Sequence, residues 1–325
     1  MQKKNLKKIL YVGMRYDYGR PEQGFSFEYT NFYSSLNRIV PELVEFDFMS
    51  IMQKEGRERM NALLLETAEK EEPDMIFFIL FTDEIDKKTI GSLSKKFVTF
   101  NWFCDDHWRF HNFSKHFAPE FHFVSTTDHD AVEKYHSIGY SNVIQTQWGC
   151  NHFDYKKIPG SGKLFDVSFV GQPHGNRKKV IFRLEEQNIR VEAFGNGWEN
   201  GRVSQERMVE IFNQTKVNLN LSNSSWNIRT IFRNKQQIKG RNFEVPGCGS
   251  LLLTDAVPRL DEYYCIDKEV VCFRSSKELT EKIRYYLSHD DEREAIAAAG
   301  YARTLKEHTY ERRFIDIFDK MNFDI

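Results

Sequence analysis

Short apolar runs alternate with amphipathic segments along the whole chain. In the first half, runs that predict buried strands cover residues 8–13, 43–48, 75–81, 98–103, 121–125 and 142–148. Between them apolar residues recur at helical spacing, which predicts helices over residues 25–39, 55–70, 84–97, 106–116 and 128–138. Strands that alternate with helices in this way are typical of a parallel, doubly wound sheet.

The alternation stops at residues 154–165, DYKKIPGSGKLF, where proline and glycine predict a linker. A second set of strands then follows at residues 166–171, 190–194, 217–221, 251–254 and 269–273. Its helices are predicted over residues 177–187, 205–214, 241–248, 276–288, 290–299 and 309–322. Gly300 is the expected stop signal for the helix over 290–299. We therefore expect two α/β domains in tandem, with ligands bound beyond the carboxyl ends of the strands.

Composition narrows the function classes. The 325 residues suit two domains, and 46 Lys and Arg against 47 Asp and Glu lack the basic excess of a non-specific nucleic-acid binder. The longest apolar run, Met75 to Phe81, is far shorter than the roughly 20 residues that cross a bilayer, so no transmembrane segment is expected. The five cysteines contain no CxxC, which indicates buried thiols in a reducing cytoplasm.

The segment KGRNFEVPGCG, from Lys239 to Gly249, is the strongest candidate site. Two cations flank a glycine, and Glu244 follows three residues after Arg241. Lys and Arg at the start of a helix favour a diphosphate, and a carboxylate can accept hydrogen bonds from ribose hydroxyls. The alternative is a surface turn with solvated charges, in which Glu244 only starts the helix.

Two glycine-bearing loops follow other strands of the second half. In FVGQPHGNRKK a strand ends at Gly171, and Arg177 and Lys178 begin a helix, an arrangement that suits a phosphate although it is neither a Walker loop nor GxGxxG. In FGNGW, which contains Gly195, the glycines let a flat ligand approach the backbone. An ordinary strand-to-helix turn explains the first loop equally well, and a simple tight turn is the more frequent explanation of the second.

In the first half, NWFCDDHWRFH places Asp105, Asp106 and His107 just past a predicted strand. Paired acids beside a histidine can do acid–base work or bind sugar hydroxyls. His107 and His111 are also spaced for a metal shared with Asp106, but no further ligand set stands out, so no metal is expected. Helix capping and aromatic packing are the alternative. The polar loop over residues 16–28 is a candidate acceptor-side or lid element.

The segment KGRNFEVPGCGSLLLTD resembles the C-terminal domain of the glycosyltransferases that are grouped with the spore maturation protein (CgeB-like) family. These enzymes are relatives of glycosyltransferase family 4. FVGQPHGNR and KVNLNLS upstream, and the HTYERR run from His308 downstream, are similar to that family as well. NWFCDDHWRF and FVSTTD resemble its N-terminal domain. The resemblance thus spans most of the chain, and its specificity lies in the order of the motifs.

The resemblance implies the GT-B fold, in which two Rossmann-like domains with parallel sheets face a cleft. Residues 1–155 would form the N-terminal, acceptor-side domain, and residues 156–308 the C-terminal domain that binds the nucleotide-sugar donor. The helix within 309–325 would pack back on the first domain.

The resemblance also implies a donor-nucleotide site that consists of Gly171, Arg177, Gly195, Asn220, Lys239, Arg241 and Glu244. The three cations would hold the diphosphate, and Gly171 would allow its close approach. The FGNGW and NLNLS segments would line the base. Glu244 matches the second glutamate of the E-x7-E motif, which is expected on the donor ribose.

The first glutamate of that motif falls at Gln236, so the chain departs from the family at the expected donor-sugar contact. His107 corresponds to a cleft histidine near the donor sugar of related enzymes. His107 and its neighbour Asp106 are the candidate catalytic residues.

The expected function is that of a hexosyltransferase-like enzyme that moves a sugar from a nucleotide-diphosphate sugar to a saccharide, lipid-linked or protein acceptor, in polysaccharide or glycoconjugate biosynthesis. Retention of configuration is expected from the resemblance, and no metal or cofactor is expected because fixed cations would stabilise the departing diphosphate. A sugar-nucleotide epimerase on the same fold is one alternative. A non-catalytic nucleotide- or carbohydrate-binding protein is the other, kept open by Gln236.

Overall fold

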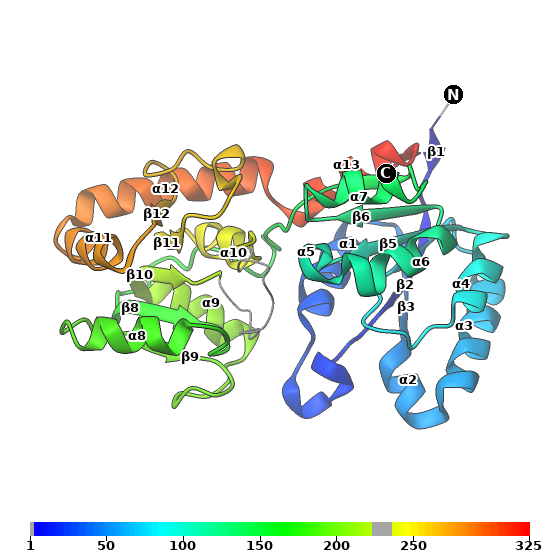
Figure 1. Cartoon of the computed structure of the whole chain (residues 1–325), viewed down its shortest axis with the longest axis horizontal. Helices are drawn as coiled ribbons and strands as arrows, with labels where there is room; N and C mark the ends of the chain where they lie inside the picture. Colours follow the sequence, from blue (N-terminus) through cyan, green and yellow to red (C-terminus); the bar gives the residue numbers. More distant parts are fainter. Residues whose placement is uncertain (1–2, 223–235) are drawn as a thin grey trace. The chain divides into compact units, whose positions relative to one another are not determined.

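The computed structural model describes residues 3–222 and 236–325 (Figure 1). The chain divides into two compact units. The first consists of Met1–Gln147 and Tyr310–Ile325, and the second of Trp148–Thr309. Each unit is described separately below.

A six-stranded parallel sheet in the order β3-β2-β4-β5-β6-β7 forms the centre of the first unit. Its strands are β2 (Lys8–Gly13), β3 (Glu42–Asp47), β4 (Met75–Phe78), β5 (Val98–Phe103), β6 (Phe123–Thr126) and β7 (Val143–Gln145). The chain adds β3 on one side of β2 and then returns to place β4 on the other side. The gap between β2 and β4 is therefore the topological switch point, where open α/β sheets bind ligands.

The helices of the first unit are α1 (Ser34–Ile39), α2 (Phe48–Glu55), α3 (Arg57–Glu71), α4 (Lys87–Ser94), α5 (Asp106–Arg109), α6 (Lys115–Phe117), α7 (Ala131–Ser137) and α13 (Tyr310–Lys320). Two π-helical turns, η3 (Tyr29–Tyr33) and η4 (Phe110–Ser114), lie inside regions predicted as continuous helix. The predicted strand over 43–48 ends one residue early, because the Asp47 carboxylate accepts a hydrogen bond from the Ser50 backbone N–H at 3.3 Å and so caps α2. Gly56, with φ of +85°, then separates α2 from α3.

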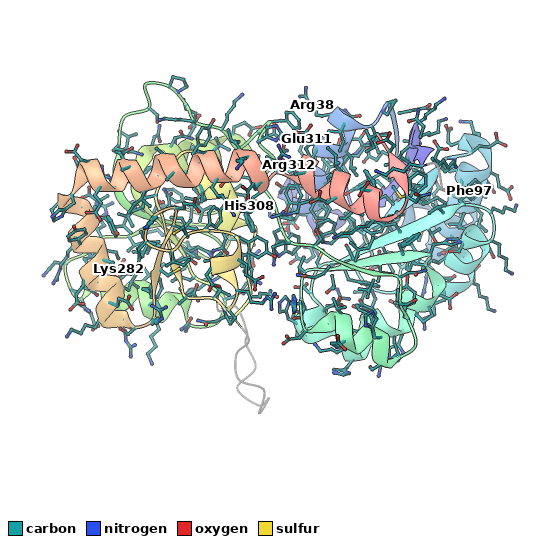
Figure 2. The ribbon with its side chains drawn as sticks, turned by 90° about the horizontal axis from the view of Figure 1, so that it is seen from above. Arg38, Phe97, Lys282, His308, Glu311 and Arg312 are labelled. Carbon is teal, nitrogen blue, oxygen red and sulfur yellow. The ribbon has the colours of Figure 1, made fainter. Side chains whose placement is uncertain are left out.

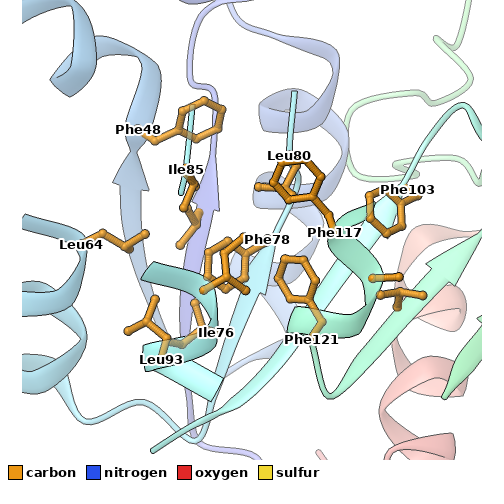
Figure 3. Close-up of a cluster of buried hydrophobic side chains, with 14 of the residues drawn as sticks. Phe48, Leu64, Ile76, Phe78, Leu80, Ile85, Leu93, Phe103, Phe117 and Phe121 are labelled. Carbon is orange, nitrogen blue, oxygen red and sulfur yellow. The ribbon is translucent and has the colours of Figure 1, made fainter. Parts of the chain in front are cut away.

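The two faces of this sheet bury different side chains. Ile76 and Phe78 of β4 join the cluster in Figure 3, which packs beneath α3 and α4. Phe77 points to the opposite face, because side chains alternate along a strand. There its ring lies 5.7 Å from that of Phe314 on α13, which also contacts Phe32 at 5.8 Å. The last helix of the chain therefore completes the core of the first unit.

The second unit contains a five-stranded parallel sheet in the order β12-β11-β10-β8-β9. Its strands are β8 (Phe165–Val170), β9 (Glu192–Phe194), β10 (Thr215–Asn220), β11 (Leu252–Asp255) and β12 (Val271–Phe273). Its helices are α8 (Arg177–Glu185), α9 (Gln205–Gln214), α10 (Arg241–Gly247), α11 (Ser276–Ser288) and α12 (Asp290–Glu307). The switch point lies between β8 and β10, which matches the order of the first sheet.

Helix α12 continues to Glu307, so the predicted stop at Gly300 is wrong. A Cβ at position 300 would lie 2.2 Å from the Glu269 carbonyl oxygen. The glycine is therefore needed for the close approach of another backbone segment, which the local sequence signal cannot distinguish from a helix end.

The boundary between the units also differs from the predicted one. The first unit ends at Gln147, before the expected linker over 154–165. That segment lies within the second unit, where the Asn213 side chain accepts from the Ile158 backbone N–H at 2.8 Å and the Lys163 ammonium donates to the Asn213 carbonyl at 3.0 Å. These hydrogen bonds fix a segment whose composition indicates flexibility.

We predict that Phe314→Ala will destabilise the first unit by about 3–5 kcal/mol, because a buried phenylalanine leaves a cavity among other rings. Phe314 is fully buried, whereas Ile315 on the same helix is 46% exposed, so Ile315→Ala should change stability by less than about 0.5 kcal/mol. Native-state hydrogen exchange of β4 and β5 peptides measures both effects. Equal effects of the two substitutions would contradict the role assigned to α13.

Candidate functional site

Most of the predicted site residues gather at the carboxyl edge of the second sheet. Gly171 follows β8, Gly195 follows β9, and Asn220 ends β10. Lys239 and Arg241 lie where α10 begins. This edge is where the topology of an open α/β sheet leads us to expect a ligand.

Two arginines converge on the switch point of this sheet. Arg241 Nε donates to the carbonyl of Val170, the last residue of β8, at 3.3 Å. Arg177, at the start of α8, donates from Nε and from one terminal nitrogen to the Leu221 carbonyl just past β10, at 2.9 and 2.7 Å. Its other terminal nitrogen donates to the Gln172 carbonyl at 2.8 Å. The ends of two adjacent strands thus each carry a guanidinium group.

Both guanidinium groups stay charged near neutral pH. Burial lowers the pKa of Arg177 to about 10, although the charge of Asp255 opposes the shift. Burial also acts to lower the pKa of Arg241, but the nearby carboxylate of Glu244 outweighs it and the pKa is raised. Two fixed cations at one sheet edge suit an anionic ligand.

Glu244 forms a buried ion pair with Arg241, three residues earlier in the chain. The glutamate side chain is fully buried, whereas the arginine side chain is 24% exposed. The carboxylate therefore orients the guanidinium and is not open to a ribose in this structure. This differs from the direct ribose contact expected for Glu244.

Aromatic packing also holds helix α10, which contains both residues of this ion pair. The ring of Phe243 lies 5.5 Å from that of His308. Figure 2 shows His308 at the end of α12. The His308 Nε2 atom is hydrogen-bonded to the Tyr263 carbonyl oxygen at 2.6 Å. The histidine of the HTYERR run thus supports the helix that positions Arg241.

Asn220 takes part in a buried polar network. Its side-chain nitrogen donates to the Asn242 side-chain oxygen at 3.2 Å and to the Thr254 hydroxyl at 3.1 Å. The same Asn242 oxygen accepts from the backbone N–H of Lys239 at 2.8 Å. Asn220 is 3% exposed, so in this structure it connects β10 to β11 and α10, which differs from the expected lining of the base.

Asp255, at the end of β11, is a site residue that the sequence reasoning did not select. Its carboxylate accepts from the Ser222 backbone N–H at 3.0 Å, from the Ser222 hydroxyl, and from the Gln236 side-chain nitrogen at 3.2 Å. An ionised glutamate at position 236 could not donate this last hydrogen bond. The glutamine at position 236, where the family has a glutamate, thus has a local physical reason. The LLLTD run, which ends on Asp255, is the sequence signal that could have identified this residue.

The two loop glycines pack against each other. Gly195 has φ of +133°, and a Cβ there would lie 2.5 Å from the Gly171 carbonyl oxygen. That oxygen accepts from the Trp198 indole N–H at 2.7 Å, and the Gly171 N–H donates to the Phe194 carbonyl at 2.8 Å. Close backbone packing therefore accounts for Gly195, whereas a Cβ at position 171 would lie 3.1 Å from the Phe169 ring.

The two candidate catalytic residues lie in the first unit. Asp106 is 1% exposed and accepts from the Tyr135 hydroxyl at 2.9 Å, and burial raises its pKa. The Nε2 atom of half-buried His107 lies 3.8 Å from a carboxylate oxygen of Asp128, which also pairs with the Lys134 ammonium at 3.1 Å. Asp106 thus has a protein partner in this structure, and its catalytic role stays a prediction. Among the described residues, no group of three or more His, Cys, Asp and Glu side chains is placed to hold a metal ion.

We predict that Glu244→Gln will destabilise the second unit by about 3 kcal/mol, because it leaves the buried side of Arg241 without its counter-charge. The pair Arg259–Glu262 has the same spacing but is 44% and 46% exposed, so Glu262→Gln should cost less than about 1 kcal/mol. Urea unfolding of both variants measures the difference. Similar losses at the two positions would mean that the buried pair is not what fixes α10.

Comparisons with known proteins agree with this architecture. Residues 177–319 match the glycosyl transferase-like family. The spore protein CgeB of Bacillus subtilis (strain 168) is 21% identical over 210 residues, which are 58% of this chain and 64% of that protein. The crystal structure of Anabaena HepE in complex with UDP and glucose covers 97% of this chain and 98% of its own, with a TM-score of 0.62 and 12% identity.

A second solved structure, sucrose-phosphate synthase from Thermosynechococcus elongatus, covers 97% of both chains with a TM-score of 0.60 and 10% identity. At such identities the likenesses to the two solved structures establish the fold and confirm the predicted fold class. The match of residues 177–319 and the likeness to CgeB confirm the family resemblance. The chain thus has the GT-B fold of two Rossmann-like units, and its residues 177–319 match the glycosyl transferase-like family.

Proposed function

We propose that this chain is a glycosyltransferase that moves a sugar from a nucleotide-diphosphate sugar to an acceptor. The observation that carries the proposal is the convergence of Arg177 and Arg241 on the switch point between β8 and β10. Guanidinium groups match the geometry and charge of phosphate oxygens. A diphosphate is therefore the anion that best fits the switch point of the second sheet.

The donor is proposed to be a UDP-sugar. HepE, whose fold this chain shares, has been crystallised in complex with UDP and glucose. The likeness between the chains lies in the fold, so the choice of uridine and glucose is a starting point for experiment. The acceptor is proposed to be a saccharide, a lipid-linked glycan or a protein.

The two arginines would promote the departure of the nucleoside diphosphate. As the bond from the donor sugar to the diphosphate breaks, negative charge develops on the phosphate oxygens, and cations fixed beforehand stabilise that charge. Glu244 and Asp255 would act indirectly, because the first orients Arg241 and the second holds Gln236. Retention of configuration and independence of metal ions or other cofactors are parts of the same proposal.

A non-catalytic nucleotide-binding protein is the second candidate. The observation in its favour is that Gln236 is hydrogen-bonded to Asp255 where the family has a glutamate for the donor sugar. Such a protein would bind UDP-glucose without turning it over. Release of UDP in the presence of acceptor distinguishes the two candidates.

The proposed location is the cytoplasm. All five cysteines are free thiols, as a reducing compartment favours. In the part of the chain that the structure describes, no helix has the length and apolar character needed to cross a membrane.

We predict that Arg177→Gln will weaken the binding of UDP and UDP-glucose roughly 10- to 150-fold while the binding of uridine changes little. Hydrogen bonds to charged groups contribute about 1.5–3 kcal/mol, and about 1.4 kcal/mol corresponds to each factor of ten. Lys179→Gln, an exposed change on the same helix, is the matched control and should bind like the native chain. Calorimetry measures the affinities. Native affinity for UDP in a folded Arg177→Gln variant would place the donor elsewhere.

We also predict that removal of divalent ions will not abolish UDP binding or turnover, because arginines supply the positive charge. Calorimetry with UDP, and an assay of UDP release from UDP-glucose, are run with and without EDTA. Loss of both UDP binding and UDP release in EDTA, with recovery on addition of magnesium, would show that a metal ion completes the site.

A further inference from the structure

The loop after β9 contains two Asn-Gly pairs, Asn196–Gly197 and Asn200–Gly201. A glycine that follows an asparagine has no Cβ to hinder the approach of its backbone nitrogen to the asparagine side chain. Both asparagines are exposed to water. The two pairs therefore have the same sequence and similar exposure, and they differ in their hydrogen bonds.

Hydrogen bonds hold the second pair. The side-chain nitrogen of Asn200 donates to the Ala193 carbonyl at 3.1 Å. The backbone N–H of Gly201 donates to the Trp198 carbonyl, also at 3.1 Å. An attack of the Gly201 nitrogen on the Asn200 side chain would have to break both of these hydrogen bonds.

The first pair lies in a turn without such hydrogen bonds. The turn is closed by the Trp198 N–H, which donates to the Gly195 carbonyl at 3.1 Å, and Asn196 and Gly197 are its two central residues. Neither the Asn196 side chain nor the Gly197 N–H is hydrogen-bonded to another residue in the part of the chain that the structure describes. Gly197 is itself exposed. The backbone nitrogen and the side-chain amide are therefore adjacent and both open to water.

The reaction available to such a pair is deamidation. The Gly197 nitrogen gives its proton to hydroxide and attacks the Asn196 Cγ atom. A C–N bond forms there, the bond to the side-chain nitrogen breaks, and that nitrogen leaves as ammonia after taking a proton from water. Water then opens the cyclic imide at either carbonyl, which gives aspartate or isoaspartate. Water is the only reactant consumed, and nothing is oxidised or reduced.

This turn packs on the segment that Arg177 contacts. A Cβ at position 197 would lie 3.0 Å from the Pro173 side chain. Arg177 donates to the carbonyl of the preceding residue, Gln172, at 2.8 Å. A carboxylate at position 196 therefore adds negative charge to the edge of the second sheet that presents the two arginines.

We propose that Asn196 is a site of spontaneous deamidation in the folded protein, that Asn200 is protected from it, and that the new carboxylate weakens the binding of UDP. The modification stands on the structure of the loop after β9 alone. Its effect on UDP is the one part that rests on the proposed function. The affinity of the chain for its donor would then fall as the protein ages.

The test incubates the full chain at mildly alkaline pH in water enriched in heavy oxygen, which labels each newly formed carboxyl group. Peptide mass spectrometry follows both asparagines over time. We expect Asn196 to be labelled roughly tenfold faster than Asn200 in the folded chain, because two hydrogen bonds oppose the second reaction. In urea both pairs lose their structure and should be labelled at similar rates. Asn196→Gln should lack the fast site, because glutamine would have to close a larger ring.

The labelling rates can overturn the site in two ways. Equal labelling of the two asparagines in the folded chain, or faster labelling of Asn200, would contradict the protection that the hydrogen bonds provide. A preference for Asn196 that persists unchanged in urea would assign the difference to the neighbouring sequence and would overturn the structural explanation.

The effect on UDP is tested with Asn196→Asp, which is one of the two products. Calorimetry should show UDP binding weakened roughly two- to fivefold at low salt and less at high salt. Asn188→Asp adds the same charge at an exposed position beyond the other end of α8 and should bind UDP like the native chain. Native affinity in Asn196→Asp would overturn the effect on UDP. Labelling of Asn196 in a native chain that does not bind UDP would support the modification while the proposed function fails.

Discussion

The arrangement of the second unit depends on one buried ion pair, Arg241 with Glu244. A carboxylate away from water is costly unless a cation and hydrogen bonds satisfy it. Here the cation is the same group that reaches the end of β8, so the pair fixes the position of a guanidinium group at the sheet edge. Packing of Phe243 against His308 holds α10, and thereby the pair, against α12. An exposed pair on a mobile turn could not hold a cation so firmly.

The two units use one topology for different chemistry. In both sheets the second strand is added on one side of the first and the third on the other, which leaves a switch point at the carboxyl edge. In the second unit this position carries Arg177 and Arg241, with the carboxylates of Asp255 and Glu244 beside them. In the first unit the loop that follows β2, at the corresponding position, carries stacked aromatic rings. The same backbone frame therefore presents arginines in one unit and aromatic rings in the other.

Two residues that the sequence marks as candidate site residues have buried protein partners in this structure. Asn220 joins a network with Asn242 and Thr254, and Asp106 is held by Tyr135. These residue types suit ligand binding and buried hydrogen bonding equally well, and only burial separates the two uses. The i, i+3 spacing of Arg241 and Glu244 did indicate that they could pair. This spacing did not indicate that the Glu244 carboxylate would be fully buried.

The sequence by itself determined the strands, because a buried parallel strand needs a short apolar run, and every predicted run of this kind is a strand in the structure. It also determined the α/β class through the alternation of strands with helices. The tertiary structure alone decided the strand order and the passage of α12 through Gly300, while the place of α13 in the first unit was implied by the family resemblance and not by any local pattern. Each of these depends on contacts between segments distant in sequence, such as Phe314 with Phe77 or Gly300 with the Glu269 carbonyl, and local patterns contain no information about which distant segment will approach.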